Sequence, residues 1–87
     1  MSDILNVSVV VLASFRHGQL RPQVMQYGGR TIRFATTTLV YAEGEGEQRA
    51  VYCTVSADTA VYTLVFYPYR LTWRLLTITD EDIYQDG

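Results

Sequence analysis

The sequence predicts an all-β protein: a single small domain of about six antiparallel strands in up-and-down order, in a strongly curved sheet or partly closed barrel. Three observations lead to this prediction. Apolar side chains recur with a period of two along several stretches, as they do on one face of a strand. β-branched and aromatic residues, which favour strands, dominate these stretches. Short segments of turn-forming residues separate them, as in hairpins.

Length and composition set the limits of the chain. Its 87 residues allow one small domain, which we assign to residues 1–79. The remaining residues, 80–87, form an acidic C-terminal tail with three Asp and one Glu. A hydrophobic content of 48% is too high for a disordered chain. The single cysteine and the start Met-Ser-Asp, which lacks the basic residues of a signal peptide, favour a reducing, cytoplasmic setting.

The first strand is predicted between Leu5 and Phe15, where every second side chain is apolar. Val10 and Leu12 interrupt the polarity of its other face. A long, bent strand, shared between two sheets or curving into a barrel, accounts for this change.

Gly28-Gly29 gives the clearest hairpin signal in the chain. Two glycines supply the positive φ angles of a type I′ turn, whose twist suits paired strands. That turn places Met25 opposite Ile32, and the hydrophobic pattern requires the same register. Residues 35–41 continue the β-rich sequence, and a polar, Gly-rich loop follows at residues 43–48.

The hydrophobic core is expected on the last hairpins, where the only Trp and the densest aromatic content lie. A four-residue turn at residues 56–59 would place Cys53 opposite Tyr62. A turn after Pro68 would place Phe66 beside Trp73, an aromatic cross-strand pair. The inward set is Tyr62, Leu64, Phe66, Trp73 and Leu75.

The opposite face of these hairpins is also apolar, which is unusual for a sheet with one wetted side. Such a patch often marks a contact surface. Either the first strand or the tail covers it, or a second chain does, most simply by two-fold self-pairing. The predicted interface residues are Tyr52, Val61, Val65, Tyr67, Leu76 and Ile78.

The residues give no indication of an enzyme, a cofactor or a metal site. His17, the only histidine, lies in a predicted turn, and Cys53 lies in the middle of a strand, where a thiol acts as a small apolar group. The sequence therefore predicts a non-catalytic module that self-associates or binds a protein partner. The alternative is a single-stranded nucleic-acid module, because small β-barrels stack bases on aromatics beside basic residues. Its candidate residues are Arg33, Tyr69, Arg70 and Arg74.

Five short segments carry a likeness to a known family: Leu20-Arg21-Pro22, Tyr27-Gly28-Gly29-Arg30, Val51-Tyr52, Val61-Tyr62-Thr63-Leu64 and Trp73-Arg74-Leu75. They resemble a small bacterial all-β domain of unassigned function, which is appended in some proteins to Y-family DNA-polymerase-like subunits of mutagenic repair. The likeness spans most of residues 7–78, but the chain lacks the Trp-rich segment between the third and fourth strands of that family. The resemblance implies an accessory β-module, favours the nucleic-acid alternative slightly, and carries over no catalytic residue.

Overall fold

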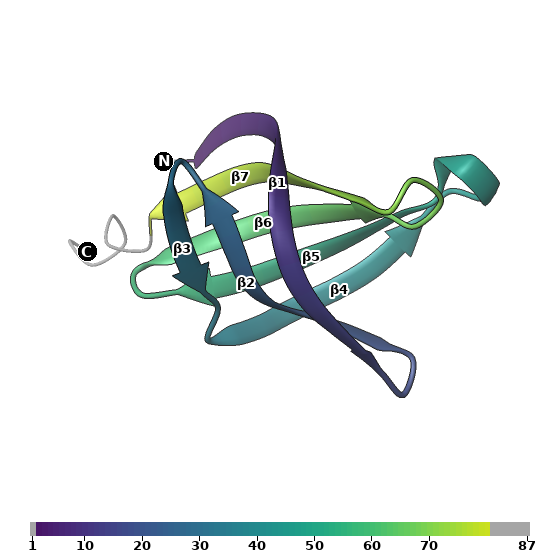
Figure 1. The fold of residues 1–87 in the computed structure, drawn as a ribbon, viewed down its shortest axis with the longest axis horizontal. Coiled ribbons are helices and arrows are strands. Elements are labelled where there is room, and N and C mark those ends of the chain that lie inside the picture. Colours follow the sequence, from purple (N-terminus) through teal and green to yellow (C-terminus); the bar gives the residue numbers. More distant parts are fainter. Residues whose placement is uncertain (1, 81–87) are drawn as a thin grey trace.

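The computed structural model describes residues 2–80, which form one antiparallel sheet of seven strands curled into a half-barrel (Figure 1). The strand order is β3-β2-β1-β7-β6-β5-β4. In Figure 1, strands β4 to β7 run across the view and strands β1 to β3 cross in front of them. The strands are β1 (Ser2–Arg16), β2 (Gln19–Tyr27), β3 (Arg30–Arg33), β4 (Thr36–Glu43), β5 (Ala50–Ala57), β6 (Ala60–Tyr67) and β7 (Thr72–Asp80).

The predicted fold class is confirmed, with seven strands in place of about six. The difference arises at a corner between β3 and β4, where the chain changes partners within two residues. The amide of Phe34 donates to the carbonyl oxygen of Gln23 in β2 at 2.9 Å, whereas the amide of Ala35 donates to Ser56 in β5 at 2.7 Å. A continuous β-rich stretch is thereby divided between the two ends of the sheet. Residues 81–87, most of the predicted acidic tail, lie outside the described residues.

Strand β1 is the long, bent strand that the sequence predicts, and it joins the two halves of the barrel. Its first half pairs with β7 and its second half with β2. The register of the β1–β7 pair shifts between Ile4 and Val7, and Asn6 there has a φ of 50°. Asn tolerates this left-handed conformation better than most residues. The guanidinium of Arg74 donates to the Asn6 side-chain oxygen at 2.6 Å and also to the Asn6 carbonyl oxygen.

Two of the three predicted hairpin registers are confirmed. Gly28 and Gly29 have φ angles of 59° and 76°, and Met25 pairs with Ile32. Phe66 pairs with Trp73, with ring centroids 4.9 Å apart. The β5–β6 register is wrong by two residues, because the turn has two residues instead of four and Cys53 pairs with Leu64. A shift of two keeps every side chain on its predicted face.

The core fills the inner, concave side of the half-barrel. All five inward residues predicted on β6 and β7 are buried, and Leu64 and Leu75 are completely inaccessible to solvent. Alternate residues of β1 pack against them from the other half of the barrel.

Ile78 does not lie on the outer face, where the sequence predicted it. The β6–β7 register shifts so that Leu64 pairs with Leu75 while Thr63 pairs with Thr77. Leu76 is therefore an extra residue in β7, and a β-bulge of this kind exchanges the two faces of the strand beyond it. Ile78 pairs with Tyr62 and packs against the core.

Candidate functional site

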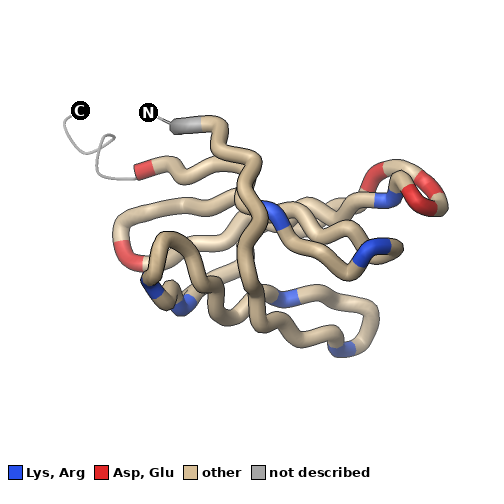
Figure 2. The backbone as a smooth tube through the Cα atoms, turned by 45° about the horizontal axis from the view of Figure 1, so that its top comes forward, with Lys and Arg blue, Asp and Glu red and all other residues tan. Residues whose placement is uncertain are grey.

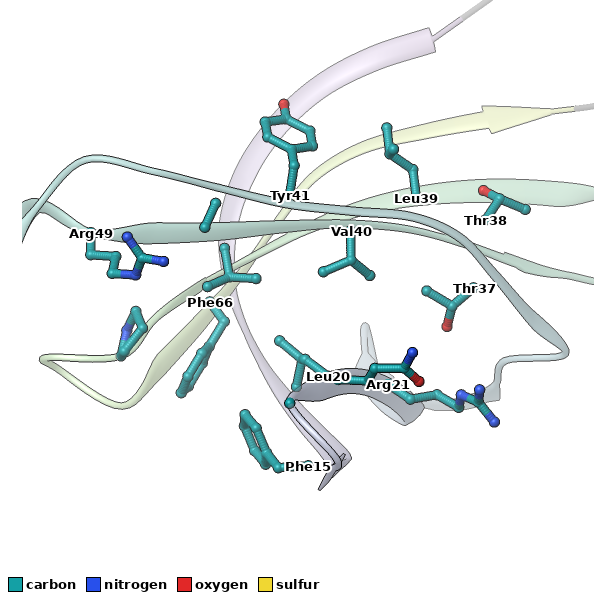
Figure 3. A pocket seen from close by; sticks show the side chains of 15 residues that line it. Phe15, Leu20, Arg21, Thr37, Thr38, Leu39, Val40, Tyr41, Arg49 and Phe66 are labelled. Carbon is teal, nitrogen blue, oxygen red and sulfur yellow. The ribbon is translucent and has the colours of Figure 1, made fainter.

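The half-barrel leaves a V-shaped groove of about 790 Å³ between the first half of β2 and strand β4 (Figure 3). Beyond Thr37 the two strands come close at the corner formed by Phe34 and Ala35, which line a second, smaller cavity. From there they diverge, because β3 pairs only with the second half of β2. The tip of the β1–β2 hairpin and the turn that contains Pro68 line the wide end of the groove.

The groove has an apolar floor. The ring of Phe15 lies 5.8 Å from that of Phe66, which in turn packs on Trp73. Val40, Leu20 and Phe15 lie on the groove side of the backbone in Figure 3, whereas Leu39 and Tyr41 point away from it. The arrangement suits a ligand with apolar groups at every second position, as in an extended peptide.

Strand β4 forms one wall of the groove, and its outer edge has no partner strand among residues 2–80. Leu39, Val40 and Tyr41, consecutive in the middle of β4, are 53%, 41% and 46% exposed. No charged residue occurs from Thr36 to Ala42. Sheet edges normally carry charges, proline or bulges that prevent pairing with other chains.

Two other free edges of the sheet, those of β3 and β2, are protected in this way. Strand β3 has only four residues, and Arg30 and Arg33 occupy its two ends. The unpaired half of β2 contains Pro22, which has no backbone N–H to offer a neighbour. Of the two strands at the ends of the sheet order, β4 is therefore the longer, with eight residues against four, and its only charge and its bulge lie outside the central run Leu39, Val40 and Tyr41.

Opposite charges flank the two ends of β4 (Figure 2). At its beginning, Arg21 lines the cavities on both sides of Thr37. At its end, Glu43 begins an acidic loop with Glu45 and Glu47, and a 3₁₀ helix at Gly46–Gln48 forms part of this loop. Arg49 is turned back onto this loop and donates to the Gly44 carbonyl oxygen at 3.3 Å.

Tyrosines extend the apolar surface of β4 onto the outer, convex face. The rings of Tyr41 and Tyr52 stack with centroids 5.0 Å apart and an interplanar angle of 14°. Burial, followed by the neighbouring Tyr67 and Glu43, raises the pKa of the Tyr52 hydroxyl above its ordinary value of 10.0. Tyr52 therefore remains neutral over the physiological pH range.

The interface predicted on the outer face of β5 to β7 is not an open apolar patch. Val65 is completely buried, since Tyr52 and Arg74 lie directly opposite it on the neighbouring strands and residues so placed contact one another. Its prediction as a contact residue is therefore wrong, as is that of Ile78. The remaining members of the predicted set are partly exposed: Tyr52, Val61, Tyr67 and Leu76.

The structure does not gather the four residues predicted to bind nucleic acid. Arg74 is engaged by Asn6. Arg33 ends β3, opposite Val24 of β2, whereas Tyr69 and Arg70 lie in the turn between β6 and β7. Figure 1 places β3 and this turn at opposite ends of the molecule.

The two residues His17 and Cys53, which carry reactive side chains, lie in different surroundings. His17 lies in the exposed turn between β1 and β2. Cys53 is completely buried, and this burial raises the pKa of its thiol to about 11, so it is protonated at neutral pH and cannot serve as a nucleophile. Among residues 2–80, no group of three His, Cys, Asp or Glu residues could hold a metal ion. No helix in the described part of the chain has the length and apolarity needed to cross a bilayer.

Sequence reasoning missed the β4 edge, although a signal was present. Leu39, Val40 and Tyr41 follow one another without alternation, and their flanks are uncharged. A strand with this pattern is apolar on both faces, as the strands of the last hairpins are. The pattern therefore predicts a contact surface on this strand too.

Comparison of the chain with protein-family models, with curated proteins and with solved structures finds no match.

Proposed function

We propose that this chain is a non-catalytic protein-binding module whose contact element is the free edge of β4. A partner strand adds to this edge and extends the sheet, so that main-chain hydrogen bonds supply affinity. The observation that carries the proposal is the run of three exposed apolar residues, Leu39 to Tyr41, within the uncharged residues 36–42 of an edge strand.

The groove supports the same function by offering a place for alternate side chains of the added strand. Side chains on one face of that strand meet Phe15, Leu20 and Phe66, all apolar. Side chains on the other face lie beside the stacked pair of Tyr41 and Tyr52. Burial of apolar area on both faces contributes about 25 cal/mol for each Å² removed from water.

Selection from a library of random linear peptides tests this function. The protein is attached to a surface at low density, so that neighbouring copies do not meet. We expect selected peptides to protect backbone amides of β4 from hydrogen exchange. Their affinity should fall at least about ten-fold for Val40→Lys, because a Lys on the edge blocks strand addition.

Val10→Lys is the matched control, since Val10 is 67% exposed on β1, which lies between β2 and β7 in the sheet order and not at its end. Peptide binding should survive this change. Peptides that bind Val40→Lys as well as they bind the unaltered chain would locate the binding surface elsewhere and refute the proposal.

A further inference from the structure

The strand that occupies the β4 edge can be identified from the edge itself. We propose that it is the β4 strand of a second copy of this chain, antiparallel to the first about a two-fold axis at Val40. This inference rests on the proposed function and names its partner.

Self-pairing requires an edge that is complementary to itself, because each copy presents the same surface. In this register Val40 faces the partner's Val40, and Leu39 faces the partner's Tyr41. The three exposed apolar residues of each copy are thereby covered by those of the other. The partner's Ala42 then lies beside the bulge at Thr38, and both residues are uncharged, so no charge is buried at the centre.

The charges at the two ends of β4 fit the same arrangement. The register brings the partner's Glu43 to the end of β4 that contains the bulge between Thr37 and Leu39, and Arg21 lines both cavities at this end. Because the strands are antiparallel, the acidic loop of each copy approaches the arginine end of the other. The two-fold axis repeats the Arg21–Glu43 contact, so each dimer contains it twice.

The groove supplies the third element of the fit. Val40 and Ala42 of the added strand share its inner face, where Phe15 at the tip of the β1–β2 hairpin leaves apolar surface uncovered. The hairpin tip of each copy then covers the β4 strand of its partner. Pairing of β4 and filling of the groove are consequences of one contact.

Sedimentation equilibrium of the full chain over a range of concentrations tests the inference. We expect a reversible dimer, whose dissociation constant rises with salt because the end contacts are exposed charge pairs. Val40→Lys should be monomeric with an unchanged circular dichroism spectrum, since its side chain is partly exposed in the isolated chain. Val10→Lys should dimerise as the unaltered chain does.

Charge reversal tests the register. Arg21→Glu and Glu43→Arg should each weaken the dimer about ten-fold, because each change replaces two attractive contacts by repulsive ones. The double variant, Arg21→Glu with Glu43→Arg, should recover most of the affinity. A change of local structure alone would not produce this recovery.

Three results would overturn the inference. They are a monomer at every concentration, a dimer insensitive to Val40→Lys, and charge reversals that do not compensate each other. A monomer whose β4 edge still binds library peptides would refute self-pairing and leave the proposed function standing. A monomer without such ligands would refute both.

Discussion

Two valines on the convex side of the sheet provide a direct test of how that side is covered. Val65 in β6 is completely buried, whereas Val10 in β1 is 67% exposed. We attribute the burial of Val65 to Tyr52 and Arg74, which flank it on the neighbouring strands. Substitution of each valine by alanine removes the same two carbon atoms from different surroundings.

The expected effects differ several-fold. For Val65→Ala, loss of about 0.8 kcal/mol for each buried carbon, together with the cavity that remains, lowers the free energy of unfolding by about 2 kcal/mol. This corresponds to a decrease of about 8–16 °C in Tm for a domain of this size. Val10→Ala should cost less than about 0.5 kcal/mol, as most exposed substitutions do.

Urea denaturation followed by the fluorescence of Trp73, the only Trp, measures both variants. Each is prepared in the Val40→Lys chain, so that self-association does not add to the apparent stability. Equal losses for the two alanine variants would show that the convex face is not closed over Val65, and the open apolar patch predicted from the sequence would then be correct.

Two further predictions concern single side chains. Arg74→Gln should lower the free energy of unfolding by about 1–2 kcal/mol in urea denaturation, because Asn6 loses two hydrogen bonds from a charged donor. The control Asn6→Asp should change the free energy of unfolding by less than about 0.5 kcal/mol, since Asp also tolerates the left-handed backbone. Equal losses for the two variants would exclude this contact as the cause. The raised pKa of the Cys53 thiol, about 11 against 9.0, makes its contribution to stability complete below pH 9 and lost as the pH rises from 9 to 11. Between pH 9 and 10, Cys53→Ala should be less stable than the unaltered chain, but its free energy of unfolding should decline less as the pH rises. Identical declines for the two proteins would show that the Cys53 thiol is not the source of this pH dependence.

The parts of the fold that the sequence predicts correctly depend on neighbouring residues. In the hairpin at Gly28 and Gly29, turn chemistry and apolar alternation require the same register, so each confirms the other. The Phe66–Trp73 pair is also set by a short turn. The error at residues 56–59 comes from assigning four residues to a turn that needs two, and Asp58 tolerates the positive φ that the shorter turn requires.

Bulges set the limit for sequence reasoning on the faces of strands. Alternation from Trp73 predicts Ile78 on the outer face, but the extra residue Leu76 reverses the face beyond it. Nothing in Leu75-Leu76-Thr77 marks a bulge, because all three residues favour strands. The face of Ile78 is decided by the pairing of β7 with β1 and β6 at once, which is a property of the assembled sheet.

The candidate site could not be predicted for a related reason. Whether a strand is central or at an edge depends on topology, and here β1 and β7 from the two ends of the described chain pair with each other and leave β4 outermost. The interface was therefore predicted on β5 to β7, whose outer face the chain covers largely by itself. Strand β4 is also apolar on both faces, but its side chains Leu39, Val40 and Tyr41 stay exposed, because no strand within residues 2–80 lies beyond β4 in the sheet.

The opening along β4 is a consequence of the β3–β4 connection. Closing the barrel would require β3 to pair with β4, but only Phe34 and Ala35 separate these strands, and the amides of both residues are already bonded to β2 and β5. A hairpin needs its two strands to reverse direction beside each other, whereas here one extended segment bends across the gap. The barrel is closed at this corner and must widen away from it. Strand addition from another chain, as proposed above, would pair the free edge of β4 and leave the corner intact.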